Sequence, residues 1–128
     1  MRLTDVTYAL MRSVVAALYV CHGVQKIFGL LGAHAVASSP LFMAAGWIEL
    51  IAGTLILVGL FTRAAAFLAS GQMAYAYFTV HAPGAFWPIV NQGELAVAYC
   101  FVFLYVCTCG AGVISLDSLR GRRGSRRA

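Results

Sequence analysis

The chain has 128 residues, of which 62% are hydrophobic and 10% are charged, and its mean hydropathy is +0.86. A soluble domain of this size carries more charge, so the composition places the chain among membrane proteins. The net charge of +5 does not indicate nucleic-acid binding, because five of the nine Lys and Arg residues stand in the last nine positions, where they suit an anchor on anionic lipid.

Residues 6–28 form the first apolar segment, which has the length of one membrane-spanning helix. At helical spacing, one face of this helix carries Arg12, Ala16, Tyr19, Gly23 and Lys26. His22 and Gln25 flank that face near its far end, which makes the last third of the helix densely polar. Lipid does not accept such a face, so we expect it to point into a helix bundle.

The second apolar segment, residues 41–60, contains a carboxylate near its middle, Glu49. A charged side chain inside a membrane is costly unless it is protonated, paired or turned towards a wet cavity. Glu49 is therefore the first functional-site hypothesis, and other polar residues are judged by whether they reach it. Gly46 and Gly53 flank it at helical spacing and either allow close helix packing or clear space beside the carboxylate.

Local signals mark both ends of this second segment. Ser39 followed by Pro40 predicts a helix start, with a capping hydroxyl and a proline at the first helical position. Gly59 predicts the helix end, and Thr62 is expected to cap the next helix. Residues 59–63 are thus expected to form a tight turn between two antiparallel helices.

The third and fourth apolar segments, residues 64–80 and 95–113, complete the predicted fold. We expect an all-α integral membrane protein, a four-helix bundle with two outer loops over residues 29–40 and 81–93. His81 closes the third segment and Glu94 opens the fourth, both on the outer side.

Positive charge sets the expected orientation. With both termini in the cytoplasm, eight Lys and Arg residues lie at the cytoplasmic end and Lys26 alone lies towards the outside. Because cytoplasmic loops of membrane proteins carry an excess of Lys and Arg, we expect both termini inside. Residues 1–117 would form a single domain, and residues 118–128 a basic cytoplasmic tail.

Depth estimates bring several outer polar residues together. With a rise of about 1.5 Å per residue, Glu49 lies roughly 12 Å and His22 roughly 9 Å below the outer boundary, and Lys26 can reach towards Glu49 or up to water. We predict a ligand-binding group made of His22, Gln25, Lys26, Glu49, His81 and Glu94. The alternative is a buried pair of Glu49 with Lys26 or His22 that only fixes helix register.

The remaining candidate groups favour structural roles. At the inner end, Arg12 and Arg63 are expected to meet Asp117 and, together with lipid phosphate, to fix the topology. The four cysteines lie in apolar runs without a C-x-x-C motif, so small buried side chains are expected. The three histidines share no spacing typical of metal ligands, and no metal site is expected.

Taken together, the polar and glycine positions resemble the pattern of the DoxX family. The pattern comprises Arg12, Gly23-x-x-Lys26, Phe28-Gly29, Ala45-Gly46-x-x-Glu49, Gly53, Leu57, Gly59-Leu60-x-Thr62-Arg63-x-Ala65-Ala66, Met73, Glu94 and Gly110-x-Gly112-x-x-Ser115-Leu116-Asp117. The resemblance implies a four-helix protein of the bacterial inner membrane. The marked polar residues of the family fall on Arg12, Lys26, Glu49, Arg63, Glu94 and Asp117.

The same resemblance implies a redox context. The family is similar to the DoxD-type subunit linked with thiosulfate:quinone oxidoreductase, and other members look like membrane partners of oxidative-stress and thiol-metabolism proteins. We therefore expect a redox-accessory or binding subunit that holds a quinone-like or other amphipathic small molecule in an outward-opening bundle cavity. His22, Lys26 and Glu49 would hydrogen-bond its polar head, and Glu49 or His22 would exchange a proton with it.

Electrons would have to come from a membrane or periplasmic redox partner, because the chain has no haem, flavin or iron–sulfur motif. Two alternatives stay open. One is a stand-alone membrane enzyme that uses acid–base chemistry on a lipid-soluble substrate. The other is a structural subunit without a ligand, whose buried pair sets only the packing.

Overall fold

The computed structural model describes residues 1–32 and 39–125, and over these residues the chain is all-α, without strands. The elements are α1 (Leu3–Phe28), α2 (Pro40–Val58), α3 (Thr62–Ala76), a π-helical turn η1 (Tyr77–His81), α4 (Pro88–Asn91), α5 (Glu94–Cys109) and α6 (Leu116–Ser125). The all-α prediction is confirmed.

Two helices, α1 and α2, are long and apolar enough to cross a membrane, with 26 and 19 residues. A third apolar helix, α5, is shorter, with 16 residues. These helices indicate a membrane protein, since a span of the hydrocarbon core needs about 20 apolar residues. The direction in which the helices cross stays a prediction.

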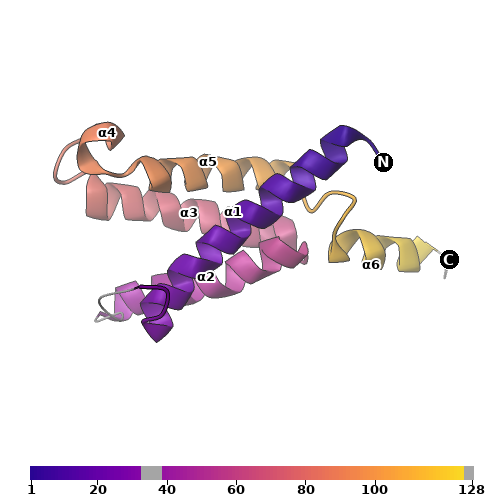
Figure 1. Ribbon diagram of the computed structural model, residues 1–128, viewed down its shortest axis with the longest axis horizontal. Helices are drawn as coiled ribbons and strands as arrows, with labels where there is room; N and C mark the ends of the chain where they lie inside the picture. The colour runs from indigo at the N-terminus through magenta and orange to yellow at the C-terminus, as the bar shows by residue number, and fades with distance from the viewer. Residues whose placement is uncertain (33–38, 126–128) are drawn as a thin grey trace.

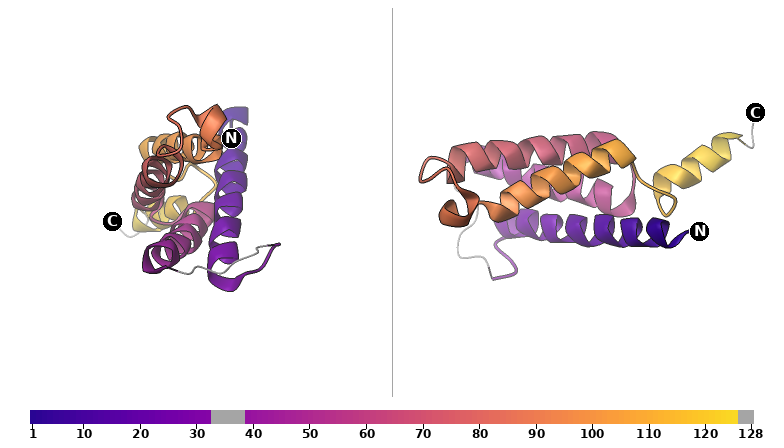
Figure 2. Two further views of the ribbon diagram at one scale, coloured as in Figure 1. Left: turned by 90° about the vertical axis from the view of Figure 1, so that its left-hand side faces the viewer. Right: turned by 90° about the horizontal axis from the view of Figure 1, so that it is seen from above.

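Over the described residues, the bundle consists of four helical segments, namely α1, α2, α3 continued by η1, and α5 (Figure 1). The closest helix pairs are α1 with α2 and α3 with α5, and contacts between α2 and α3 join the two pairs. The N-terminus and α6 lie at one end of the bundle, and α4 lies at the other (Figures 1 and 2). We call these the α6 end and the α4 end.

Several predicted helix boundaries are confirmed. Ser39 is the N-cap of α2, and its hydroxyl accepts a hydrogen bond from the backbone N–H of Phe42 at 3.2 Å. Gly59 ends α2 in the left-handed conformation, with φ 72°. That conformation favours a residue without a side chain, so the glycine allows the sharp turn into α3.

The predicted cap of the third helix is wrong. The N-cap of α3 is Phe61, with φ 48°, and Thr62 is the first helical residue. Asp117 supplies the capping oxygens instead, because it accepts hydrogen bonds from the backbone N–H groups of Phe61 and Thr62, each at 3.1 Å. An acid from a distant part of the chain thus satisfies amides that have no partner inside their own helix.

Other boundaries differ from the predicted segments. Helix α1 starts three residues before the expected 6–28 segment. The expected 64–80 segment is split into α3 and the π turn η1, and the expected 95–113 helix ends at Cys109. Gly110, with φ 81°, is the C-cap of this helix, α5. Part of the expected tail over residues 118–128 lies in α6, which is helical up to Ser125.

Small residues let the helices pack closely around an aromatic centre. Alanines line the buried face of α3, at positions Ala65, Ala66 and Ala69. Tyr19 of α1 packs against Phe103 of α5, with ring centroids 4.8 Å apart, and both side chains are fully buried. This packing fixes Tyr19 in the interior of the bundle, where Glu49 of α2 is also buried.

Candidate functional site

The polar stripe predicted on the first helix forms its buried face. The buried residues of α1 are Ala9, Arg12, Ala16, Tyr19 and Gly23, which recur every three or four positions. The side chain of Lys26 continues this stripe and is 20% exposed. Helix α1 therefore turns Arg12, Tyr19 and Lys26 towards the bundle.

Glycines bring α1 and α2 into close contact next to the carboxylate. A Cβ atom added to Gly23 would lie 2.7 Å from the backbone nitrogen of Leu50 and 2.8 Å from the carbonyl oxygen of Gly46. One added to Gly46 would lie 3.0 Å from the Cβ of Lys26. The glycines on both helices thus serve close packing, one of the two roles considered for Gly46, and they set Lys26 opposite Glu49.

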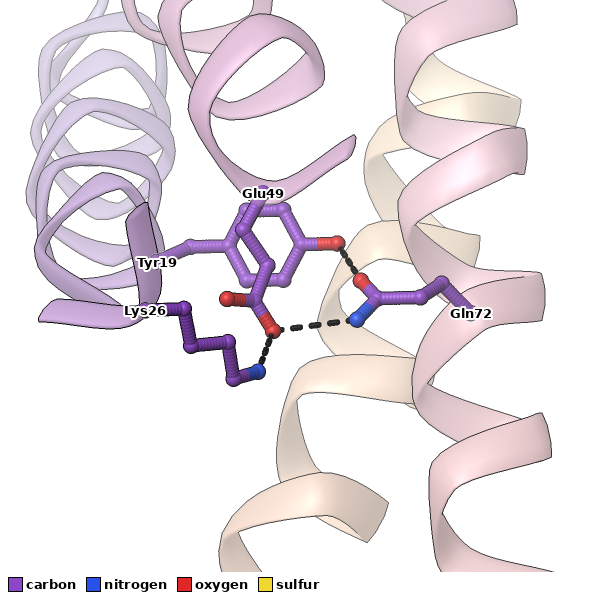
Figure 3. A network of polar contacts seen from close by, with 4 residues as sticks. All are labelled: Tyr19, Lys26, Glu49 and Gln72. Atoms are coloured by element: carbon purple, nitrogen blue, oxygen red, sulfur yellow. Dashed lines mark hydrogen bonds and ion pairs between the residues drawn. The ribbon is translucent and has the colours of Figure 1, made fainter. Parts of the chain in front are cut away.

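Glu49 is the centre of a side-chain network that links three helices (Figure 3). Its Oε1 atom accepts a hydrogen bond from the ammonium of Lys26 and another, at 3.0 Å, from the amide nitrogen of Gln72 on α3. The amide oxygen of Gln72 in turn accepts a hydrogen bond from the hydroxyl of Tyr19. Among the described residues, Lys26–Glu49 is the one ion pair.

One oxygen of this buried acid is unused. The side chain of Glu49 is 1% exposed, and its Oε2 atom has no hydrogen-bond partner among the described residues. In Figure 3 this oxygen points away from Gln72, towards the side of α1. Leaving a buried charged acceptor without a donor is destabilising by roughly 1–3 kcal/mol or more. The network therefore contains an acceptor that a hydroxyl or amine from outside the chain would satisfy.

Lys26 connects the buried acid to the surface. Its ammonium lies 5.0 Å from the ring centroid of Phe42, which is 45% exposed at the start of α2. A lysine has a flexible stem and can move its charge between a buried acid and water. Lys26 and Phe42 thus stand between Glu49 and the outside of the α1–α2 pair.

Four predicted site residues take no part in this network's hydrogen bonds. His22 packs edge-on against Tyr99, at 5.9 Å between ring centroids. Gln25 donates to the backbone carbonyl of Leu31, and the Nδ1 atom of His81 is 3.1 Å from the carbonyl oxygen of Asn91. Glu94 is exposed in the first turn of α5. The structure thus joins Lys26 to Glu49 directly, whereas His22, Gln25 and His81 make separate contacts and Glu94 is exposed.

Sequence reasoning missed Gln72. It is an amide within an apolar segment, so the argument that singled out Glu49 could have found it. Its hydrogen bond to Glu49 depends on how α3 is rotated about its axis, since this rotation turns Gln72 towards α2. Tyr19 was placed on the polar stripe, but its hydrogen bond to Gln72 follows from the same rotation.

The expected inner cluster is present at the α6 end, but its members do not form ion pairs. The guanidinium of Arg12, which is 2% exposed, donates to the carbonyl oxygens of Ile56, Leu57 and Ile114, the last two at 2.9 and 2.8 Å. Two of these acceptors lie at the carboxyl end of α2, where the helix dipole favours a cation. Arg12 therefore satisfies carbonyl groups at the end of α2 and links this helix to the segment before α6.

Arg63 and Asp117 also bind the main chain. Arg63 donates to the carbonyl oxygens of Cys107 and Cys109, at 2.9 and 3.5 Å. Partial burial raises the pKa of Asp117, but hydrogen bonds from the N–H groups of Thr62 and Phe61 outweigh it and bring the pKa below its usual value of 3.8. The expected meeting of the two arginines with Asp117 is thus replaced by three separate contacts with helix ends.

Several hollows in the described part of the chain lie away from the Glu49 network. An apolar groove of about 380 Å³ runs between α3 and α5, and its walls include Met73, Phe78, Trp87 and Phe101. A second hollow, of about 490 Å³, lies at the α6 end beside Arg12. Over residues 1–32 and 39–125, no group of three His, Cys, Asp or Glu side chains is arranged to hold a metal ion.

Comparison with known proteins finds one matching family and a related protein. The pattern of the DoxX family matches residues 7–82. A protein of Haemophilus influenzae is 42% identical over 117 residues, covering 86% of this chain and 87% of its own length, and is described as an uncharacterized protein. No solved structure matches the chain.

Proposed function

The chain belongs to the DoxX family, and from this premise we propose that it is a binding or redox-accessory subunit of the bacterial inner membrane. It would hold a quinone-like or other amphipathic small molecule at the Glu49 network. The bundle helices would span the bilayer with both chain termini in the cytoplasm.

The charge distribution supports this orientation. Four arginines lie towards the α6 end of the bundle. They are Arg2 and Arg12 in the first part of the chain, Arg63 after the α2–α3 turn, and Arg120 in α6. Lys26, near the other end of α1, pairs with Glu49. Since basic residues favour the cytoplasmic side, the α6 end would face the cytoplasm and the Glu49 network would lie in the outer half of the membrane.

One observation carries the proposal of a ligand. The Oε2 atom of Glu49 is buried and lacks a donor among the described residues, while Oε1 has two. A pair that only fixed helix register would be more stable with both oxygens satisfied. The unused acceptor is what a binding site needs, namely a polar atom held in place by its neighbours and available to a ligand.

The network's chemistry suits the polar head of a quinone. Lys26 can donate to a quinone carbonyl, and the free oxygen of Glu49 can accept the hydroxyl proton of the reduced form. Electrons would pass to or from a partner redox protein, because the chain carries no haem, flavin or iron–sulfur motif. The residues of this chain would bind and orient the head group, and Glu49 would accept the proton that the reduced form releases.

A structural role is the competing account, and it also has an observation in its favour. The Lys26–Glu49 pair lies beside the close approach of α1 and α2 at Gly23 and Gly46, where a pair would fix the register of the two helices. This account gives no purpose to the unpaired oxygen. It also predicts that the amide variant Glu49→Gln changes stability and leaves ligand content unchanged.

Native mass spectrometry of the gently purified protein tests the proposal. We expect a quinone or similar amphiphile to accompany the wild-type chain and to be lost in Glu49→Gln. Asp5→Asn is the matched control, because it makes the same acid-to-amide change at Asp5, which caps its own helix through the N–H of Arg2 at 2.8 Å. A wild-type protein without any amphiphile, or equal content in Glu49→Gln, would contradict the proposal.

A further inference from the structure

We infer that the Glu49 site selects ligands that donate an O–H group, so that it favours the reduced, hydroquinone form of its ligand over the oxidised quinone. This inference rests on the proposed function and names the class of ligand that the same site prefers. It depends on which atoms of the network are already occupied.

The Oε1 atom of Glu49 already has two hydrogen-bond donors. It accepts hydrogen bonds from both the Lys26 ammonium and the Gln72 amide. Both donors stabilise the ionised carboxylate. An ionised carboxylate offers only acceptors, so the remaining oxygen, Oε2, can bind a donor and repels another acceptor.

Gln72 and Tyr19 hold this hydrogen-bond arrangement in place. The amide of Gln72 turns its nitrogen to Glu49 and its oxygen to the hydroxyl of Tyr19, which donates to it. If the amide were reversed, its oxygen would face the carboxylate, acceptor against acceptor. Tyr19 is fully buried between α1 and α5, next to Phe103, so its hydroxyl is held by packing. Gln72 and Tyr19 are therefore positioning residues for the free oxygen.

The two redox forms of a quinone differ in what they offer to Oε2 of Glu49. The head of an oxidised quinone carries only acceptor oxygens, and one of them against Oε2 would place two partial negative charges together. A phenol or hydroquinone O–H instead forms a charge-assisted hydrogen bond with the carboxylate, among the stronger hydrogen bonds in proteins. A site whose free atom is an ionised, buried acceptor thus distinguishes the two forms by one proton.

The route to the free oxygen passes Lys26. Its side chain is one-fifth exposed and lies over Phe42, whereas Glu49 is closed to solvent. An amphiphile entering from the outer half of the membrane would meet the aromatic ring first and the ammonium next. Lys26 can remain bonded to Oε1 while the ligand head binds Oε2, because the two oxygens are separate acceptors.

A matched pair of ligands isolates the donor. We would titrate 4-decylphenol and 4-decylanisole, which differ by a methyl group in place of the hydroxyl hydrogen, into protein in lipid nanodiscs and subtract the partition into empty nanodiscs. The phenol is expected to bind about tenfold to a hundredfold more tightly, as one charge-assisted hydrogen bond implies. Neither compound requires a redox partner.

Variants then assign the preference to the network. In Glu49→Gln the side chain offers a donor as well as an acceptor, so the phenol-to-anisole ratio should fall close to one. Gln72→Leu and Tyr19→Phe should reduce the ratio, whereas a purely structural role would weaken both ligands equally. Ser70→Ala is the control, because Ser70 is a buried residue of the same helix that bonds the carbonyl of Cys100 at 2.8 Å; its ratio should not change.

The outcomes distinguish a failure of the proposed function from a failure of the ligand selectivity. If neither compound binds saturably, the proposed function itself fails. If both bind with equal affinity, the selectivity is wrong while a ligand site remains. If the phenol is preferred but the preference survives in Glu49→Gln, the donor is recognised elsewhere and the assignment to Glu49 is overturned. Should Glu49→Gln not fold, the ratios in Gln72→Leu and Tyr19→Phe decide.

Discussion

The two polar regions of the bundle use their side chains in different ways. At the α6 end, Arg12, Arg63 and Asp117 bind main-chain carbonyl and amide groups at helix ends. Around Glu49, side chains bind one another across three helices. Each region also holds one buried polar atom without a partner among the described residues, Nε of Arg12 and Oε2 of Glu49. The first region is made of contacts that hold the backbone, and the second of groups that can exchange partners.

This difference distinguishes a structural contact from a ligand-binding site. Helix ends present orphan carbonyl and amide groups that must be satisfied, and a residue that does so has little freedom left. A carboxylate bonded by a flexible lysine and an amide can gain or release a partner without loss of a helix end. Variants at the α6 end should therefore change stability, and variants around Glu49 should change ligand binding as well.

The largest effect is expected for Arg12→Met at the α6 end. Charge-assisted hydrogen bonds contribute roughly 1.5–3 kcal/mol each, so losing those to Ile56, Leu57 and Ile114 should lower the free energy of unfolding by about 3 kcal/mol or more. Unfolding in mixed detergent micelles measures this. Ligand content per folded molecule should stay at the wild-type level; its loss would break the distinction between the two regions.

Gly23→Ala should separate the network from its support. The added Cβ would meet backbone atoms of α2 at 2.7 and 2.8 Å, and such overpacking costs about 1–3 kcal/mol. It should also weaken ligand binding, because Lys26 would move away from Glu49. Gly71→Ala is the control: its Cβ meets nothing within 4 Å, so the helix should gain up to about 1 kcal/mol. Equal stability of the two variants would be incompatible with the close helix contact.

A double-mutant cycle sharpens the description of the Glu49 network. Glu49→Gln and Lys26→Met, each alone and then together, should reveal a coupling energy of about 1–3 kcal/mol in unfolding. If the residues act as one unit, the double variant costs no more than either single variant. Strictly additive losses would show that the ion pair contributes nothing of its own.

The smallest effect concerns Asp117. Its folded pKa is below the usual value of 3.8, so its contribution to stability is present above that pH and is lost as pH falls through the depressed value. Asp117→Ala should lower stability by about 1 kcal/mol at neutral pH, as removal of an N-cap does. Once the pH is below the depressed pKa of Asp117, the variant and the wild type should converge in stability. A difference that persists in acid would rule out the ionised cap.

Much of the fold could be predicted from local sequence signals. Ser39, Pro40 and Gly59 are short-range signals, and each lies where its backbone chemistry requires. The stripe that includes Tyr19 and Gly23 was predicted because a helix repeats every 3.6 residues. The match to the DoxX family confirms the resemblance that rested on the combined pattern.

The long-range contacts could not be predicted in the same way. Depth along the helix left both His22 and Lys26 as possible partners of Glu49. In the structure Lys26 bonds the carboxylate, while His22 packs against the ring of Tyr99. Asp117 caps a helix 55 positions earlier in the chain, a contact that no local pattern encodes. The arginines found carbonyl oxygens at helix ends where pairing with the acid had been expected.

The central claim is that one oxygen of Glu49 accepts a hydrogen bond from a bound amphiphile, and infrared difference spectroscopy tests it most directly. Adding 4-decylphenol to the protein in nanodiscs should shift a carboxylate stretching band, and the shift should be absent with 4-decylanisole and in Glu49→Gln. A spectrum without a carboxylate change in the wild-type protein, or an identical change in Glu49→Gln, would contradict the account.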